Sequence, residues 1–209
     1  MAVGAYYKKK IKFKFMKKES LKKEQEAFDH QIVERIKNGH VPDLRFNKKV
    51  KYFYNNVWRD PYLVKHTFGN TVKLFNQSLG NESKILEIGC GPGHMSLELA
   101  RLGHKVCGID LSPACIDIAN STAKKRAKHL LIEKKLEYRV SNLIDFENQN
   151  NKYDAIVFCG SLSHFTNLSH VFKKINKIVK KKSKILIWDT CIEQYDYNDA
   201  LMYETMAQF

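Results

Sequence analysis

The chain has 209 residues, which is enough for one sizeable domain with a small addition. Its apolar fraction of 44% and charged fraction of 28% are typical of a soluble globular protein. No apolar run is long enough to span a membrane, and the basic N-terminus lacks the apolar core of a secretory signal. These features exclude an integral membrane protein and favour a cytoplasmic one.

The formal net charge is +14, and most of the positive charge comes from lysine. A basic surface can bind nucleic acid, but lysine-rich composition also gives an ordinary solvated surface, which we favour. The five cysteines are scattered and none forms a C-x-x-C pair, so we expect reduced thiols and no metal site.

The N-terminal part of the chain divides into two predicted units. Residues 1–16 read as a disordered basic arm, with an RNA-binding arm as the alternative. Residues 17–82 read as a helical cap, with one helix over 17–38 and a second from Pro61 to about Leu79. The segment 52–62 between them is rich in aromatics, which suits a joint between cap and core, a lid over a ligand, or both.

From residue 83 to 209, short apolar strands alternate with helical patterns. Strands are predicted over 84–88, 105–109, 136–140, 152–158 and 184–188, with helices near 94–102, from Ser112 onward, and over 166–181. This alternation predicts an α/β three-layer sandwich with a mainly parallel sheet. Ligands of such sheets bind beyond the carboxyl ends of the strands, and the residues that follow these strands are polar.

The first strand leads into the most informative stretch of the chain. Glycines at 89, 91 and 93 give the spacing G-x-G-x-G, and His94 stands where a dinucleotide-binding loop would need its third glycine. Glu87 precedes the loop; an acid there would repel a pyrophosphate but could pair with a cationic ligand.

The pattern E-x-G-x-G-x-G resembles the first motif of the class I, Rossmann-like S-adenosylmethionine-dependent methyltransferases. His164 corresponds to a histidine that is often present in the small-molecule branch of that family. The resemblance implies S-adenosyl-L-methionine as cofactor, with the loop beneath its methionine part. The residues that it places at the cofactor here are Glu87, Gly89, Cys90, Gly91 and Gly93.

Asp110 closes the second strand about 20 residues beyond the glycine loop, where an acid can accept both hydroxyls of a ribose. The run from Val106 to Ser112 resembles the second methyltransferase motif, which implies that Leu111 sits beside the adenine. Asn142 and Leu143 end the third strand, where many family members have an aspartate on the adenine amino group. An asparagine can accept that hydrogen bond through its amide oxygen.

The segment from Tyr153 to His164 resembles the fourth-strand motif of the family. It implies that Cys159 and Gly160 lie at the cofactor, while Asp154 begins the strand and is structural. His164 is a candidate general base or acceptor-positioning residue, and His66 is a second candidate base.

The acceptor is the open question. The resemblance implies in-line transfer of a methyl group to a small molecule. The aromatic segment lies outside the resemblance, and we expect it to cover the acceptor, with Tyr54 and Trp58 among the acceptor-binding residues. One alternative is an RNA or protein methyltransferase that uses the basic surface; another is an inactive truncated fragment. No Asn-Pro-Pro motif occurs, which disfavours enzymes that methylate amino groups of DNA adenine or of glutamine.

Two departures from the family pattern concern the C-terminal part. The turn before the fifth strand is Lys180-Lys-Lys-Ser-Lys184 instead of the usual K-P-G-G, and no sixth or seventh strand follows before Phe209. We therefore expect either a truncated sequence or a sheet with a bare edge at the fifth strand. Such an edge could pair with a partner, and the oligomeric state stays open.

Overall fold

The computed structural model describes residues 18–46, 60–126, 132, 134–147 and 152–189. The predicted basic arm, Tyr54 and Trp58 of the aromatic segment, and the C-terminal residues from 190 onward lie outside the described residues.

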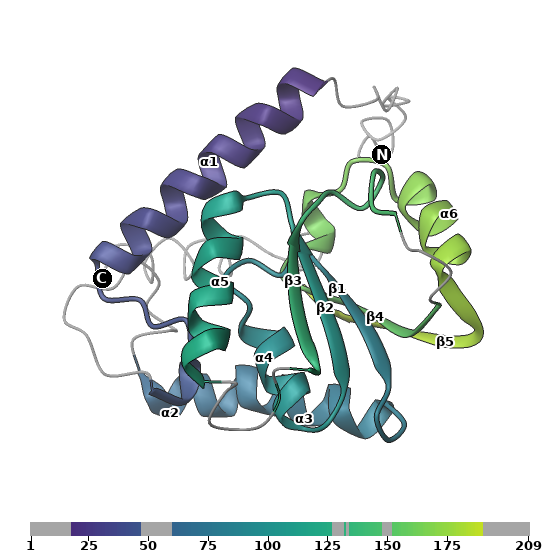
Figure 1. Ribbon diagram of the computed structural model, residues 1–209, viewed down its shortest axis with the longest axis horizontal. Helices are drawn as coiled ribbons and strands as arrows, with labels where there is room; N and C mark the ends of the chain where they lie inside the picture. The colour runs from purple at the N-terminus through teal and green to yellow at the C-terminus, as the bar shows by residue number, and fades with distance from the viewer. Residues whose placement is uncertain (1–17, 47–59, 127–131, 133, 148–151, 190–209) are drawn as a thin grey trace, which may run out of the picture.

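Five parallel strands form the centre of the molecule (Figure 1). They lie in the order β3-β2-β1-β4-β5. Their bounds are Lys84–Ile88 for β1, Lys105–Asp110 for β2, Leu136–Val140 for β3, Tyr153–Cys159 for β4 and Val179–Trp188 for β5. The order reverses between β1 and β4, and a crevice for a ligand opens at such a reversal beyond the carboxyl ends of the strands.

Helices cover both faces of the sheet and confirm the predicted three-layer α/β architecture. Their bounds are Lys18–Lys37 for α1, Pro61–His66 for α2, Phe68–Ser78 for α3, His94–Arg101 for α4, Pro113–Arg126 for α5 and Leu168–Ile178 for α6, with short 3-10 turns η1 (Leu44–Phe46) and η4 (Leu162–His164).

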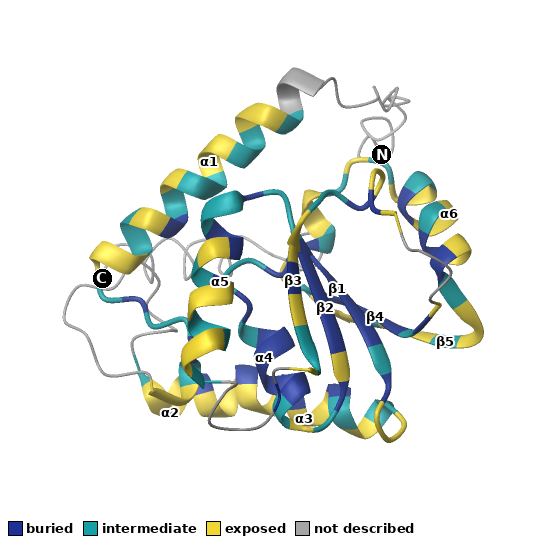
Figure 2. Ribbon diagram, viewed as in Figure 1, coloured by how far each residue is buried: buried dark blue, intermediate teal, exposed yellow. Residues whose placement is uncertain are grey.

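Alternate side chains of β1 and β4 point into two separate cores. Ile85 and Val157 pack on one face with α3 and α4, while Leu86 and Ile156 pack on the other with α6. The central strands are accordingly the most buried part of the sheet (Figure 2). Since residues alternate between faces along a strand, the two cores explain why these strands are continuous apolar runs.

Two helix boundaries differ from the predictions. The helix expected from Pro61 to Leu79 is broken into α2 and α3 at Thr67, whose hydroxyl donates to the carbonyl of Leu63 at 2.8 Å. Such a bond competes with the helix ladder and bends the chain.

The second difference lies at the lysine-rich turn. The helix expected over 166–181 ends at Ile178, and the lysines from 180 to 182 join β5 as an irregular bulge opposite β4. The Ser183 hydroxyl closes this bulge, because it lies 2.7 Å from the carbonyl oxygen of Tyr153 and 2.8 Å from that of Lys180.

The segment after α1 is anchored to the core by a buried ion cluster. Asp43 accepts from the Arg101 guanidinium at 2.6 and 2.9 Å, and Glu98 pairs with Arg101 and with Arg45. The side chains of Asp43 and Arg101 are 2% and 4% exposed, so solvent screens this pair weakly. No helix in the described part of the chain is long and apolar enough to cross a membrane.

Replacing Asp43 by asparagine should destabilise the protein by about 2–4 kcal/mol, because it leaves the Arg101 charge buried and only partly compensated. Urea unfolding measures this loss. The matched control is Glu34→Gln at the solvent-facing pair with Lys37, which should leave the unfolding midpoint unchanged. Equal midpoints for Asp43→Asn and wild type would contradict the assignment.

Candidate ligand cavity at the carboxyl ends of the strands

A cavity of about 720 Å³ lies at the carboxyl ends of β1, β2 and β4, and α1 forms its outer wall. Loops that follow four strands line it, together with α1 and residues of α4, α5 and α6. A volume of this size is typical of small-molecule sites. The fold therefore places a ligand-sized cavity at the reversal of strand order.

Glu87 is the most deeply buried acid that lines the cavity, and 2% of the residue is exposed. Burial raises the pKa of its carboxyl group to about 8, and a hydrogen bond from the Ser96 hydroxyl opposes that rise. A carboxyl group held in this way favours a cation beside it, since a positive charge offsets the cost of ionising it in a buried site.

The glycine loop is held by the carboxylate of Asp110. One oxygen accepts from the amide of Gly91 at 2.8 Å, and the other accepts from the amide of Ser112 at 2.9 Å. Gly91 has φ +52°, and a Cβ added there would meet no atom within 4 Å. Since Gly91 lines the cavity, its bare backbone is available to a ligand.

Gly89 and Gly93 are needed for packing as well. A Cβ on Gly89 would lie 2.5 Å from the Cβ of Ser161, and one on Gly93 would lie 2.4 Å from the Tyr138 hydroxyl oxygen. Gly93 is not part of the cavity lining; its carbonyl accepts a 2.8 Å hydrogen bond from Tyr138. A cofactor contact by Gly93 stays a prediction, whereas its steric role follows from these distances.

His94, directly after the loop, is tied to the segment that follows α1. Its Nδ1 lies 2.5 Å from the carbonyl oxygen of Pro42, and its Nε2 lies 3.2 Å from Nε2 of His40. Burial lowers the pKa of His94 to about 4 and that of His40 to about 3, so both rings are neutral at pH 7. Nδ1 of His94 then donates to Pro42, and His40 donates to His94. The pair fixes the cap against the glycine loop.

The remaining predicted cofactor residues also line the cavity. These are Cys90, Leu111, Asn142, Leu143, Cys159 and Gly160. A Cβ on Gly160, which has φ +67°, would meet nothing within 4 Å, so this glycine leaves open space as Gly91 does. Burial raises the pKa of the Cys159 thiol well above its usual value, which keeps the thiol protonated.

Of the predicted catalytic and acceptor-binding residues, only one is found at the cavity among the described residues. His164 lines the cavity from η4, and its ring meets that of Phe28 edge-on with centroids 5.3 Å apart. His66 lies at the end of α2 against Tyr62 and is not among the lining residues. Tyr54 and Trp58 are outside the described residues.

Helix α1 contributes residues that the sequence reading missed. Glu24, Phe28 and Arg35 line the cavity, whereas Val33 and Ile36 of the same helix are 43% and 37% exposed. Arg35 is the only lysine or arginine in the lining that the described residues form. Glu24, Phe28 and Arg35 recur at helical spacing in the sequence, but polar residues at such spacing are typical of a helix face that is exposed to solvent.

A model of a methyltransferase domain family matches residues 58–206, most of the chain. The chain belongs to this family. A ubiquinone biosynthesis O-methyltransferase of Pelagibacter ubique is 28% identical over 145 residues, which cover 68% of this chain and 56% of that protein. The chain spans about half the length of the curated relatives that it matches.

Solved structures share the fold. A protein of Pyrococcus horikoshii superposes with a TM-score of 0.58 at 24% identity, over 74% of this chain and 64% of that chain. A TehB-like SAM-dependent methyltransferase from Corynebacterium glutamicum gives a TM-score of 0.50 at 17% identity, over 89% of this chain and 83% of that chain.

The residues of the cavity fit the cofactor of S-adenosylmethionine-dependent methyltransferases. Gly91 and Gly160 leave open space that side chains would fill, and the buried carboxyl group of Glu87 suits a cationic group. Each oxygen of the Asp110 carboxylate accepts one hydrogen bond from a backbone amide and can accept another from a ligand. No three His, Cys, Asp or Glu side chains gather as a metal site within the described residues.

Glu87→Gln should change how stability depends on pH. The folded pKa of Glu87 is raised, so its contribution to stability falls as pH rises from 4.5 to about 8. The variant lacks this loss and should exceed wild type by on the order of 1–3 kcal/mol at pH 8, with equality near pH 4.5. Urea unfolding across this range tests it, and a constant difference at all pH values would contradict it.

Gly91→Ala and Gly93→Ala should separate binding from folding. Each places a side chain at positive φ, which costs about 1–2 kcal/mol. The Cβ of Gly93→Ala would also collide with Tyr138, which should lower the free energy of unfolding by about 1–3 kcal/mol more. Gly91→Ala should instead weaken S-adenosylhomocysteine binding, because its methyl group enters the cavity. Denaturation and calorimetry measure the two effects, and equal stability losses would contradict the contrast.

Proposed function

We propose that this protein transfers a methyl group from S-adenosyl-L-methionine to a small-molecule acceptor. The observation that carries the proposal is that one cavity combines a buried carboxyl group at the end of β1, an open glycine loop and a second carboxylate at the end of β2. Family membership and the fold support this reading. Bound there, the cofactor would supply an electrophilic methyl group on a sulfonium, so catalysis rests chiefly on holding the reactants and excluding water.

The charged residues of the cavity match the parts of such a cofactor. Glu87 would hold the ammonium of the methionine end and Arg35 its carboxylate, while Asp110 would accept from the ribose hydroxyls. Leu111 and Leu143 would flank the adenine. Arg35 is suited to its role by position, since its charge acts on His94, the residue directly after the glycine loop.

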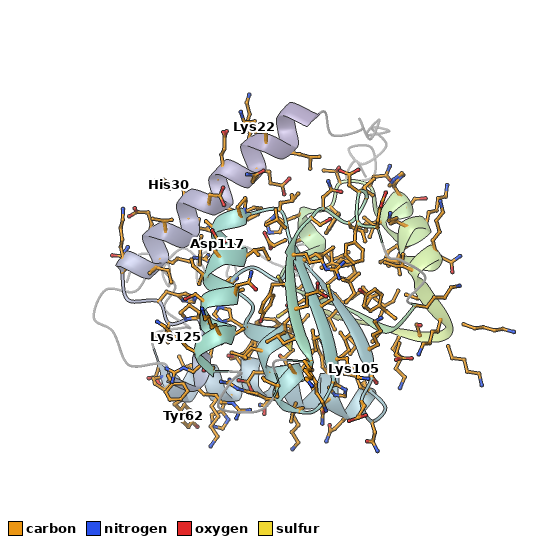
Figure 3. The ribbon with its side chains drawn as sticks, in the orientation of Figure 1. Lys22, His30, Tyr62, Lys105, Asp117 and Lys125 are labelled. Carbon is orange, nitrogen blue, oxygen red and sulfur yellow. The ribbon has the colours of Figure 1, made fainter. Side chains whose placement is uncertain are left out.

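A small acceptor is favoured over RNA by where the lysines lie. The described residues that line the cavity include no lysine and four acids, namely Glu24, Glu87, Asp110 and Asp145. Lys22 on α1, Lys105 at the start of β2 and Lys125 on α5 are instead exposed (labelled in Figure 3). Phosphate backbones are held by lysine and arginine, so an acidic cavity is a poor entrance for one.

The remaining assignments are also part of this proposal. His164 would position the acceptor or take its proton, and Asn142 would meet the adenine amino group. We divide the chain into an arm over 1–16, a cap over 17–82 and a cofactor-binding domain over 83–209. The cysteines within the described residues are free thiols, which favours a cytoplasmic location.

Arg35→Gln should weaken binding of S-adenosylhomocysteine about 10- to 100-fold through loss of a charged hydrogen-bonded pair. The affinity of the variant for 5′-methylthioadenosine should stay within about twofold of the wild-type affinity, because that ligand lacks the carboxylate. Calorimetry with both ligands measures the ratio. Asp110→Asn should weaken both alike, since both ligands carry the ribose.

The control is Lys37→Gln, which removes the same charge from the exposed end of α1 and should change neither affinity. If wild-type protein binds neither S-adenosylmethionine nor S-adenosylhomocysteine, the proposed function fails. If Arg35→Gln weakens both ligands equally, its role is structural instead.

A further inference from the structure

The outer wall of the cavity is built by a helix to which the family match does not extend. The match begins at residue 58, whereas α1 spans Lys18–Lys37. One face of α1 lines the cavity at helical spacing; its lining residues are Leu21, Glu24, Phe28, Gln31, Ile32 and Arg35. Any selection that this wall imposes on the acceptor is therefore encoded outside the matched segment.

Helix α1 is fixed to the cofactor edge of the sheet. Asp29 accepts from the Ser112 hydroxyl and from the amide of Ala114 at 3.1 Å, so it caps the start of α5 from outside. In Figure 1, α1 runs obliquely across the end of α5. Because Asp29 is one position beyond Phe28, this anchor holds the lining face of α1 at the cavity.

Glu24 is the acid of the cavity that the donor does not use. Under the proposed function, Glu87 and Asp110 belong to the cofactor, and Asp145 bonds Asn142 through its amide and its carboxylate at 2.8 and 2.5 Å. Glu24 is half-buried and makes no hydrogen bond or ion pair with another residue in the described ranges. Burial raises the pKa of its carboxyl group, and the charge of His164 opposes that rise.

Phe28 lies one helical turn beyond Glu24 on the same face of α1. Its ring meets His164 from the opposite wall, so this end of the cavity combines a carboxylate, an aromatic ring and an imidazole. A carboxylate next to an aromatic face attracts a cation through charge and through the ring quadrupole. An anion at the same place would be repelled by Glu24 and by Asp110.

We propose that the methyl acceptor carries a protonated amine, and that Glu24 and Phe28 of α1 recognise it. The inference rests on the proposed function, since the donor must occupy the rest of the cavity. It names a chemical class that the family assignment leaves open. Glu24 acts here as a specificity-determining residue, and the amine need not be the atom that is methylated.

Three probes with a shared phenyl ring and different charge test this inference. Phenethylamine, 2-phenylethanol and phenylacetate are titrated into the 209-residue protein saturated with S-adenosylhomocysteine, and binding is followed by ligand-observed NMR. Wild type should bind the amine about fivefold more tightly than the alcohol, and the acid most weakly. Glu24→Gln should abolish the preference for the amine, and Phe28→Leu should reduce it.

Glu26→Gln is the matched control, because Glu26 faces solvent beside Lys22 at 3.8 Å and loses the same charge. It should keep the wild-type preference. Equal binding of amine and alcohol to wild type, or a preference that survives in Glu24→Gln, would overturn amine recognition. Failure of wild type to bind S-adenosylhomocysteine at the outset would instead count against the proposed function.

Discussion

The carboxylate of Asp110 is the contact on which the cavity depends. Its two oxygens accept from Gly91 after β1 and from Ser112 after β2, so one side chain joins the loops of two neighbouring strands. Three of the five loop residues are glycines without side chains to hold them in place, and the positive φ of Gly91 is only one of the many backbone conformations open to a glycine. Burial raises the pKa of Asp110, while the hydrogen bonds that its carboxylate accepts from the backbone amides of Ser112 and Gly91 favour the charged form.

Further hydrogen bonds connect the two loops held by Asp110 to the N-terminal cap. Ser112 donates its hydroxyl to Asp29 and accepts from the amide of Cys115, so the start of α5 is bonded on both sides. Asp29 thereby fixes α1, and the pair of His40 and His94 fixes the segment that follows α1. The cap is thus attached to the same two loops that shape the cavity. A change in the glycine loop would be felt at α1 through these bonds.

The sheet and most of the cavity were predictable because they depend on local sequence. Each central strand is a largely apolar run with polar or glycine residues at or just beyond its end, and parallel strands bring such ends together. The role of α1 was not predictable, since Glu24 and Arg35 resemble a solvated face until the helix is seen across the sheet edge. The bulge in β5 was not predicted for a related reason. Its lysines continue the helical periodicity of α6, and only their pairing with β4 assigns them to a strand.

The charges of the cavity explain why a basic protein can have an acidic site. A buried carboxyl group such as Glu87 is costly to ionise without a cation, and the hydrogen bond from the Ser96 hydroxyl offsets only part of that cost. Residues that cost stability without structural return mark functional sites. Here one such acid lies in β1 and another on α1, and both line one cavity. The ligands that lower this cost are cations, whatever the sign of the surrounding surface.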